Sequence, residues 1–280
     1  MKFYKLLVVF FAVFFSMACY SENSFAQTGK DTDFWNWVEK KDYHNSMVKI
    51  SVPMNMDRNF DGQWDDIDDD GKPEIWKSFG TGAIIYIDKS KPIIKENNQK
   101  GYRGYALTAA HVVSSMPYEP NRKILDIKLE YQDKTESKKC IIKYIDKTMD
   151  IAIIECWVPE NGTSAKLADA AAKSGDYLEF VGLGGKSLLE KPRRFYGHAS
   201  MTTDEKSLYS HDTLFVPGDS GGPVFNSNGE LVGVISGGWF WWDGVKSPSS
   251  GDITTTWPAK SCGLKPIQNL FNKLIKEIEG

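Results

Sequence analysis

The sequence predicts an all-β protein that ends in one amphipathic helix. Short apolar runs separated by Gly, Asp and Pro are typical of the strands of a sandwich or barrel. The predicted strands are 48–52, 82–87, 105–108, 124–131, 141–145, 151–157, 177–181, 222–225, 231–236 and 253–257. After Lys265 and Pro266 the apolar residues recur at helical spacing as far as Ile278, so the chain should end in a helix packed on the strands.

Composition and charge restrict the class of protein. The 280 residues are 41% hydrophobic and 25% charged, which is ordinary for a globular chain with a sizeable core. The net charge is -3, and a nucleic-acid-binding protein would need a strongly basic face. The composition therefore argues against nucleic acid as a partner.

The first 26 residues read as a secretory signal peptide. Lys2 and Lys5 precede an apolar run at 6–15, and residues 24–26 place small side chains where a signal peptidase requires them. A membrane anchor is the competing interpretation, but the run is shorter than the roughly 20 residues that span a bilayer. A lipoprotein attached through Cys19 is disfavoured because 16–18 lacks a large aliphatic residue three positions before the cysteine.

The sequence predicts three parts along the chain. We expect residues 1–26 to be the signal peptide, 27–46 to form an N-terminal segment, and 47–280 to form one compact domain. No second apolar run is long enough to span a bilayer, so the mature form is expected to be secreted or periplasmic and free of the membrane.

Export would leave three cysteines in an oxidising compartment. Cys140 and Cys156 flank a predicted strand, turn and strand, and in a symmetric hairpin centred on Thr148 they would face each other. A disulfide between them and a pair of buried free thiols are both consistent with this pattern. Cys262 has no partner under the disulfide interpretation.

The strongest chemical signal is Gly-Asp-Ser-Gly-Gly-Pro at 218–223. A serine hydroxyl is a poor nucleophile unless a nearby base removes its proton, so Ser220 needs a histidine. The string also fits the Gly-x-Ser-x-Gly pattern of α/β-hydrolases, which place their histidine after the serine. No histidine follows Ser220 in this chain, and that interpretation fails.

His111 and Asp150 are the candidate partners of the serine. His111 lies among small and apolar residues at 107–113, which could hold an imidazole at a strand end. Asp150 immediately precedes the apolar run 151–154, where a half-buried carboxylate could fix the histidine tautomer.

These three segments together resemble the trypsin/chymotrypsin family of serine endopeptidases, in the order His, Asp, Ser. The resemblance implies two antiparallel six-stranded β-barrels with the catalytic residues in the cleft between them. It implies that Ser220 attacks the scissile carbonyl, that His111 acts as base and then acid, and that Asp150 orients His111. The backbone N–H groups of Gly218 and Ser220 would form the oxyanion hole. The substrate would be a protein or peptide, and catalysis would require no cofactor.

Two further matches concern substrate binding. Residues 234–238 resemble the strand whose backbone pairs with the substrate, so Ser236, Gly237 and Gly238 would bind the peptide main chain. Trypsin carries an aspartate six residues before its serine, and this chain has Leu214 there, so cleavage after Arg or Lys is disfavoured. The chain also lacks an Ile-Val-Gly-Gly start, which makes it more similar to the bacterial branches of the family.

An acidic insertion at 57–74 carries two overlapping matches to the start of a calcium-binding loop, each ending in a glycine. The alternating oxygen-bearing residues are Asp57, Asn59 and Asp61 in the first match and Asp66, Asp68 and Asp70 in the second. Neither match continues to the glutamate usual at the twelfth position. A structural Ca²⁺ site and a solvated acidic loop both remain open.

The function that the sequence predicts is that of a secreted serine endopeptidase acting through an acyl-enzyme. The alternative is a catalytically silent member of the same fold that binds peptides or a protein partner. The presence of His111, Asp150 and Ser220 together favours the enzyme, since a binding module needs none of the three.

Overall fold

The computed structural model describes residues 40–56, 75–95, 98–114, 122–183, 193–203, 206–210, 215, 218–238 and 259–280. The predicted signal peptide 1–26, most of the N-terminal segment, the insertion 57–74 and Leu214 lie outside the described residues.

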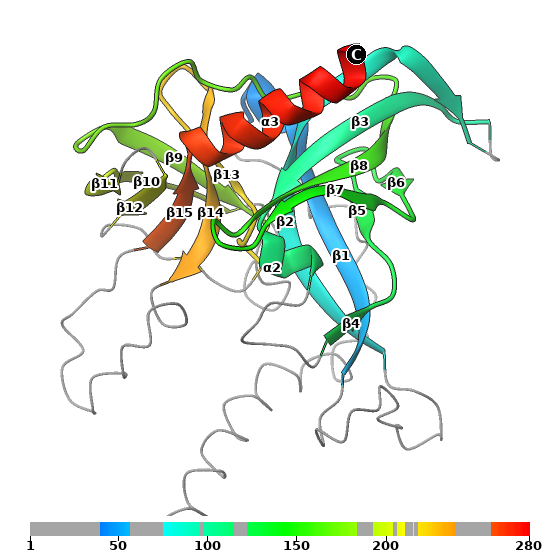
Figure 1. Cartoon of the computed structure of the whole chain (residues 1–280), viewed down its shortest axis with the longest axis horizontal. Helices are drawn as coiled ribbons and strands as arrows, with labels where there is room; N and C mark the ends of the chain where they lie inside the picture. The colour runs from blue at the N-terminus through cyan, green and yellow to red at the C-terminus, as the bar shows by residue number, and fades with distance from the viewer. Residues whose placement is uncertain are drawn as a thin grey trace, which may run out of the picture.

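The N-terminal half of the fold is one antiparallel sheet of eight strands, in the order β6-β5-β1-β2-β3-β8-β7 with β4 also paired to β1 (Figure 1). Its strands are β1 (Met47–Met56), β2 (Ile75–Ile94), β3 (Lys100–Thr108), β4 (Arg122–Ile124), β5 (Lys128–Glu130), β6 (Glu136–Ser137), β7 (Ile141–Asp146) and β8 (Ile151–Pro159). A single turn of helix, α2 (Ala110–Val113), follows β3.

The C-terminal half is a second antiparallel sheet of seven strands, in the order β10-β9-β13-β14-β15-β12-β11. Its strands are β9 (Tyr177–Gly182), β10 (Arg193–His198), β11 (Met201–Thr203), β12 (Ser207–Ser210), β13 (Pro223–Phe225), β14 (Leu231–Gly238) and β15 (Ala259–Gly263). The chain ends in helix α3 (Leu264–Glu279).

The predicted all-β class with two curled sheets and a terminal helix is confirmed. The described residues form eight strands in the first sheet and seven in the second, whereas the resemblance implied six strands in each barrel. Part of the excess has a simple origin, because β4 and β5 pair with successive stretches of the same strand, β1. The strand that the sequence predicted at 124–131 contains all of β5 and only the last residue of β4, Ile124.

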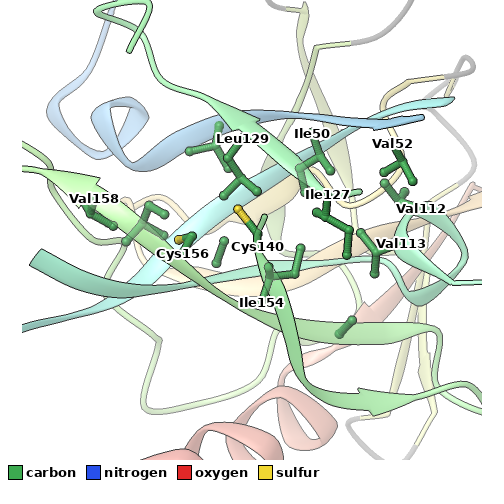
Figure 2. Packing of buried hydrophobic residues seen from close by; sticks show 14 of the residues in the cluster. Ile50, Val52, Val112, Val113, Ile127, Leu129, Cys140, Ile154, Cys156 and Val158 are labelled. Atoms are coloured by element: carbon green, nitrogen blue, oxygen red, sulfur yellow. The ribbon is translucent and has the colours of Figure 1, made fainter. Parts of the chain in front are cut away.

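The first sheet curls around a core formed by one face of each strand (Figure 2). Along β1, Val48, Ile50 and Val52 are completely buried and alternate with more polar residues, as a strand with one face on a core requires. Figure 2 shows Ile50, Leu129 of the neighbouring β5 and Ile154 of β8 among the side chains of this core cluster.

A second core cluster joins the two sheets and the terminal helix. It contains Met47 and Ile153 from the first sheet, Phe225 and Val234 from the second, and Ile267 of α3. Pro266 lies in the first turn of that helix, as predicted, and Figure 1 shows α3 running across both sheets. In the part of the chain that the structure describes, no helix combines the length and the apolar character needed to cross a membrane.

The β7–β8 hairpin has the register that the sequence predicted near its cysteines. Ile141 pairs with Glu155, so the preceding Cys140 and the following Cys156 stand opposite each other. Both are buried within the core of the first sheet, where Figure 2 shows their side chains, and both are free thiols in the structure. Burial raises the pKa of the Cys140 thiol to about 11.

Candidate active site

Neighbouring strands of the first sheet bring His111 and Asp150 together. Thr108 at the end of β3 pairs with Ala152 near the start of β8. His111 lies just past that end of β3, in α2, and Asp150 lies just before β8. The antiparallel register therefore places the two residues at one edge of the sheet.

The carboxylate of Asp150 accepts two hydrogen bonds from His111. Its Oδ1 accepts the backbone N–H at 2.9 Å, and its Oδ2 lies 2.8 Å from the ring Nδ1. Asp150 is 4% exposed and has a φ of +56°, a left-handed conformation that Asp and Asn adopt more readily than most residues. This geometry fixes the ring with Nδ1 toward the acid and leaves Nε2 as the nitrogen that can exchange a proton with a substrate or nucleophile.

A third hydrogen bond to Asp150 comes from the second sheet. The buried hydroxyl of Ser236 in β14 donates to Asp150 Oδ2 at 2.6 Å. The sequence predicted Ser236 only as a substrate-binding backbone position, so this role of its side chain was missed. No local pattern reveals it, since the two residues are 86 positions apart.

The loop with Ser220 lies against the segment that leads to His111. The N–H of Thr81 in β2 donates to the Ser220 carbonyl at 2.8 Å. A Cβ added at Gly221 would lie 2.9 Å from the backbone nitrogen of Ala109 and 2.1 Å from Thr108 Oγ1. Only glycine fits there, and its φ is +83°. The loop and the end of β3 are thus in direct contact.

The structure has no hydrogen bond between the described side chains of Ser220 and His111. This contact is often long in a free enzyme and shortens when substrate binds. The backbone contacts place Ser220 on the side of the molecule where His111 and Asp150 meet.

The predicted oxyanion-hole donors are the backbone N–H groups of Gly218 and Ser220. Gly218 has a φ of +98°, which a residue without Cβ adopts at little cost. Among the described residues, neither of these two N–H groups donates to a backbone carbonyl. Binding of a substrate's negative charge by these amides stays a prediction.

Asp219, which stands between Gly218 and Ser220 in the sequence, is completely buried. Its side chain lies against Gly182 at the end of β9, where an added Cβ would be 2.1 Å from Oδ1. The absence of a side chain at Gly182 is what makes room for this carboxylate.

The predicted substrate strand is the end of β14. Gly237 and Gly238 pair with Lys260 and Ala259 of β15. On the opposite edge, pairing with β13 ends at Pro223 and Val234, so no described strand covers residues 236–238 there. Leu214, the predicted pocket residue, lies outside the described residues.

A buried cluster outside these segments was not predicted from the sequence. Glu179 of β9 is 3% exposed and accepts hydrogen bonds from Tyr43, from His44 at 2.9 Å and from Arg194 at 2.6 Å. Burial alone would raise the pKa of Glu179, but these hydrogen bonds outweigh it and lower that pKa to about 2. Burial lowers the pKa of His44, so its ring is neutral near pH 7. The 3₁₀ turn Asp42–Ser46 is thereby tied to the second sheet.

The described part of the chain contains no group of three or more His, Cys, Asp or Glu residues arranged to hold a metal ion. The six candidate calcium ligands between Asp57 and Asp70 lie outside the described residues.

Comparison with known proteins finds a peptidase family and several serine proteases. A family model described as a trypsin-like peptidase domain matches residues 81–234, just over half of the chain. The periplasmic serine endoprotease DegP of Escherichia coli (strain K12) is 25% identical over 213 residues, covering 74% of this chain and 38% of DegP. Human serine protease HTRA3 is 29% identical over 142 residues, covering 47% of this chain and 30% of HTRA3.

Exfoliative toxin A of Staphylococcus aureus is 32% identical over 109 residues, which cover 36% of this chain and 38% of the toxin. The chain therefore spans less than half the length of each of these relatives. The two antiparallel sheets, the meeting of His111 with Asp150 beside the Ser220 loop and the family match lead to one conclusion: the chain belongs to the trypsin-like family of serine endopeptidases.

Proposed function

We propose that this protein is a secreted or periplasmic serine endopeptidase that cleaves proteins or peptides through Ser220, His111 and Asp150. The observation that carries the proposal is the pair of hydrogen bonds from His111 to the buried Asp150, at the edge where the Ser220 loop meets β3. A histidine that is oriented by a buried carboxylate beside a serine is the arrangement that activates a hydroxyl.

The reaction has two stages. Ser220 Oγ bonds to the carbonyl carbon of the scissile peptide while its proton moves to Nε2 of His111. The C–N bond then breaks, and His111 gives that proton to the leaving amine. Water then attacks the carbonyl carbon of the acyl-enzyme while His111 takes its proton; the ester C–Oγ bond breaks, His111 returns the proton to Ser220 Oγ, and the carboxylic acid product leaves.

Two sets of backbone groups assist this reaction. The N–H groups of Gly218 and Ser220 stabilise the oxyanion, and each such donor is typically worth roughly 3 to 4 kcal/mol in the transition state. The edge of β14 at 236–238, which no described strand covers, accepts the substrate backbone as an added strand. Leu214 at the predicted pocket floor makes cleavage after Arg or Lys unfavourable, since it supplies no negative charge.

Export is the second part of the proposal. It rests on the predicted signal at 1–26, and the relative DegP is itself named a periplasmic endoprotease. We also propose calcium as a structural ion of the insertion 57–74, on the sequence match alone. An unchanged melting temperature in excess chelator would count against calcium.

Labelling with a fluorophosphonate tests the enzyme proposal directly. The wild-type protein should label and cleave a denatured protein mixture, and Ser220→Ala should do neither while melting at the same temperature. A folded wild-type protein that neither labels nor cleaves would favour the alternative, a silent member that binds peptides or a partner. The sequence of the cleaved bonds would reveal the specificity.

A further inference from the structure

Thr81 connects the two sheets at the loop that carries Ser220. It belongs to β2 of the first sheet, and none of its surface is exposed. Its Oγ1 lies 2.8 Å from the carbonyl oxygen of Gly218 and 2.8 Å from the backbone nitrogen of Leu183, which follows β9 of the second sheet. Its backbone N–H reaches the carbonyl of Ser220, also at 2.8 Å.

The roles in these hydrogen bonds follow from the atoms involved. The N–H of Leu183 can only donate, so the Thr81 hydroxyl oxygen accepts it. The single hydroxyl proton is then left for the Gly218 carbonyl, which can only accept. The Thr81 hydroxyl therefore cannot exchange its donor and acceptor roles between these two partners, and the direction of its O–H bond is fixed.

Thr81 thus holds the carbonyls of the two residues whose N–H groups are the proposed oxyanion-hole donors. Its backbone fixes the Ser220 carbonyl, and its hydroxyl fixes the Gly218 carbonyl. Of the two residues, Gly218 has the weaker intrinsic limits on its backbone angles, because a glycine at a φ of +98° has no Cβ to restrict φ and ψ. An anchor on its carbonyl limits rotation about its Cα and so limits where its N–H points.

We propose that Thr81 is a positioning residue for the oxyanion hole, acting through the Gly218 carbonyl. This inference rests on the proposed function, because it concerns the same reaction. Thr81 is completely buried, so its side chain is not exposed to a substrate, and the backbone contact to Ser220 does not depend on that side chain. The contribution of the side chain is therefore the bond to Gly218 together with the bond from Leu183.

The expected effect is on the transition state. Loss of one direct oxyanion-hole donor lowers kcat by about 10²- to 10³-fold in related chemistry. Thr81 acts one step away, so we expect Thr81→Val, which keeps the shape and removes the hydroxyl, to lower kcat by roughly tenfold to a hundredfold. KM should stay within about twofold, because the substrate backbone binds to β14. Affinity for a peptide aldehyde, whose adduct carries an oxyanion, should fall in parallel with kcat.

Two further variants make the test specific. Thr81→Ser restores the hydroxyl and should recover most of kcat. Ser137→Ala is the matched control, since Ser137 is 2% exposed and its Oγ also accepts a backbone N–H, from Trp157 at 2.9 Å. It loses a buried hydroxyl in the first sheet with no connection to Gly218, so it should lower the melting temperature and leave kcat unchanged. If Thr81→Val does not fold, Thr81→Ala removes the hydroxyl with a smaller side chain and is judged by the same criteria.

The inference is overturned if a folded Thr81→Val or Thr81→Ala variant keeps wild-type kcat, or if Ser137→Ala loses as much kcat as they do. It is also overturned if the loss appears in KM alone. These results differ from a failure of the proposed function, in which wild-type protein itself neither cleaves substrate nor reacts with fluorophosphonate at Ser220.

Discussion

The carboxylate of Asp150 contacts both the backbone N–H and the ring of His111. The Oδ1 atom accepts the backbone N–H at 2.9 Å and Oδ2 lies 2.8 Å from Nδ1, so the acid fixes the position of the residue as well as the orientation of its imidazole. One carboxylate therefore supports both the local fold of α2 and the chemistry proposed for the ring.

Asp150→Asn should separate these two roles. An amide can still accept the backbone N–H and suits the φ of +56°, so the melting temperature should stay close to wild type. The amide cannot stabilise an imidazolium and favours the wrong tautomer, so kcat should fall by about 10⁴-fold. Steady-state kinetics and thermal melting measure the two effects. Asp150→Ala is the comparison and should lose stability as well as activity; an Asn variant with near-wild-type kcat would remove Asp150 from the mechanism.

Gly221 should tolerate no side chain. In Gly221→Ala the new Cβ would lie 2.1 Å from the carbonyl oxygen of Thr81, in addition to the strain of a φ of +83°. Gly175→Ala is a matched control, since its φ is +92° and nothing lies within 4 Å of an added Cβ. Backbone strain alone costs about 1 to 3 kcal/mol, so the Gly221 variant should be destabilised by several kcal/mol and the Gly175 variant by much less. Denaturant unfolding measures both; equal losses would contradict the close contact.

Acid should destabilise the fold through Glu179. Its pKa is about 2 in the folded protein and near 4.5 in an unfolded chain, so its stabilisation is present above pH 4.5 and is lost as pH falls toward 2. The full effect is roughly 3 kcal/mol. The lowered pKa of His44 acts in the same direction, because the unfolded chain takes up its proton more readily below about pH 6.5.

Glu179→Gln should therefore be less stable than wild type at pH 6 and lose less further stability between pH 5 and pH 3. Urea unfolding across this range measures the slope. Glu277→Gln is the control, since Glu277 forms its ion pair with Lys143 on the surface and should change the slope little. A Glu179 variant with the wild-type slope would show that this carboxyl does not control acid stability.

Cys140 and Cys156 should form a disulfide when the protein matures in an oxidising compartment. Their positions are opposite in the β7–β8 hairpin and both lie in one core cluster. Thiol counting in denaturant without reductant should then find one reactive thiol, from Cys262, in protein lacking the signal peptide. Cys262→Ser should leave none. Three reactive thiols would favour the buried free pair that the sequence also allowed.

Strands with a continuous apolar run could be predicted closely from the sequence. The run 151–157 corresponds to β8, which ends at Pro159, and the pairing of Ile141 with Glu155 follows from the predicted hairpin. By contrast, β10 begins with two arginines and β12 is a short polar segment, so neither has an apolar pattern. These strands exist because they pair with β9 and β15, and a tertiary pairing of this kind leaves no local signal.

The candidate site likewise contains some residues that a local sequence pattern identifies and others that it does not. His111 and Ser220 stand in motifs whose neighbours identify them, because the chemistry constrains several consecutive residues. Thr81 and Glu179 stand in ordinary strand sequence, where a threonine or a glutamate predicts nothing by itself. Their importance comes from partners far along the chain, such as Gly218 for Thr81, which is 137 positions away.

Helix α3 packs on both sheets and so links their relative positions. Its buried Ile267 and Leu274 belong to the cluster that also contains Met47 of the first sheet and Phe225 of the second. Any tilting of one sheet against the other would have to open this shared apolar packing. Helix α3 therefore couples the orientation of the first sheet to that of the second, and with it the position of Asp150 relative to Ser236.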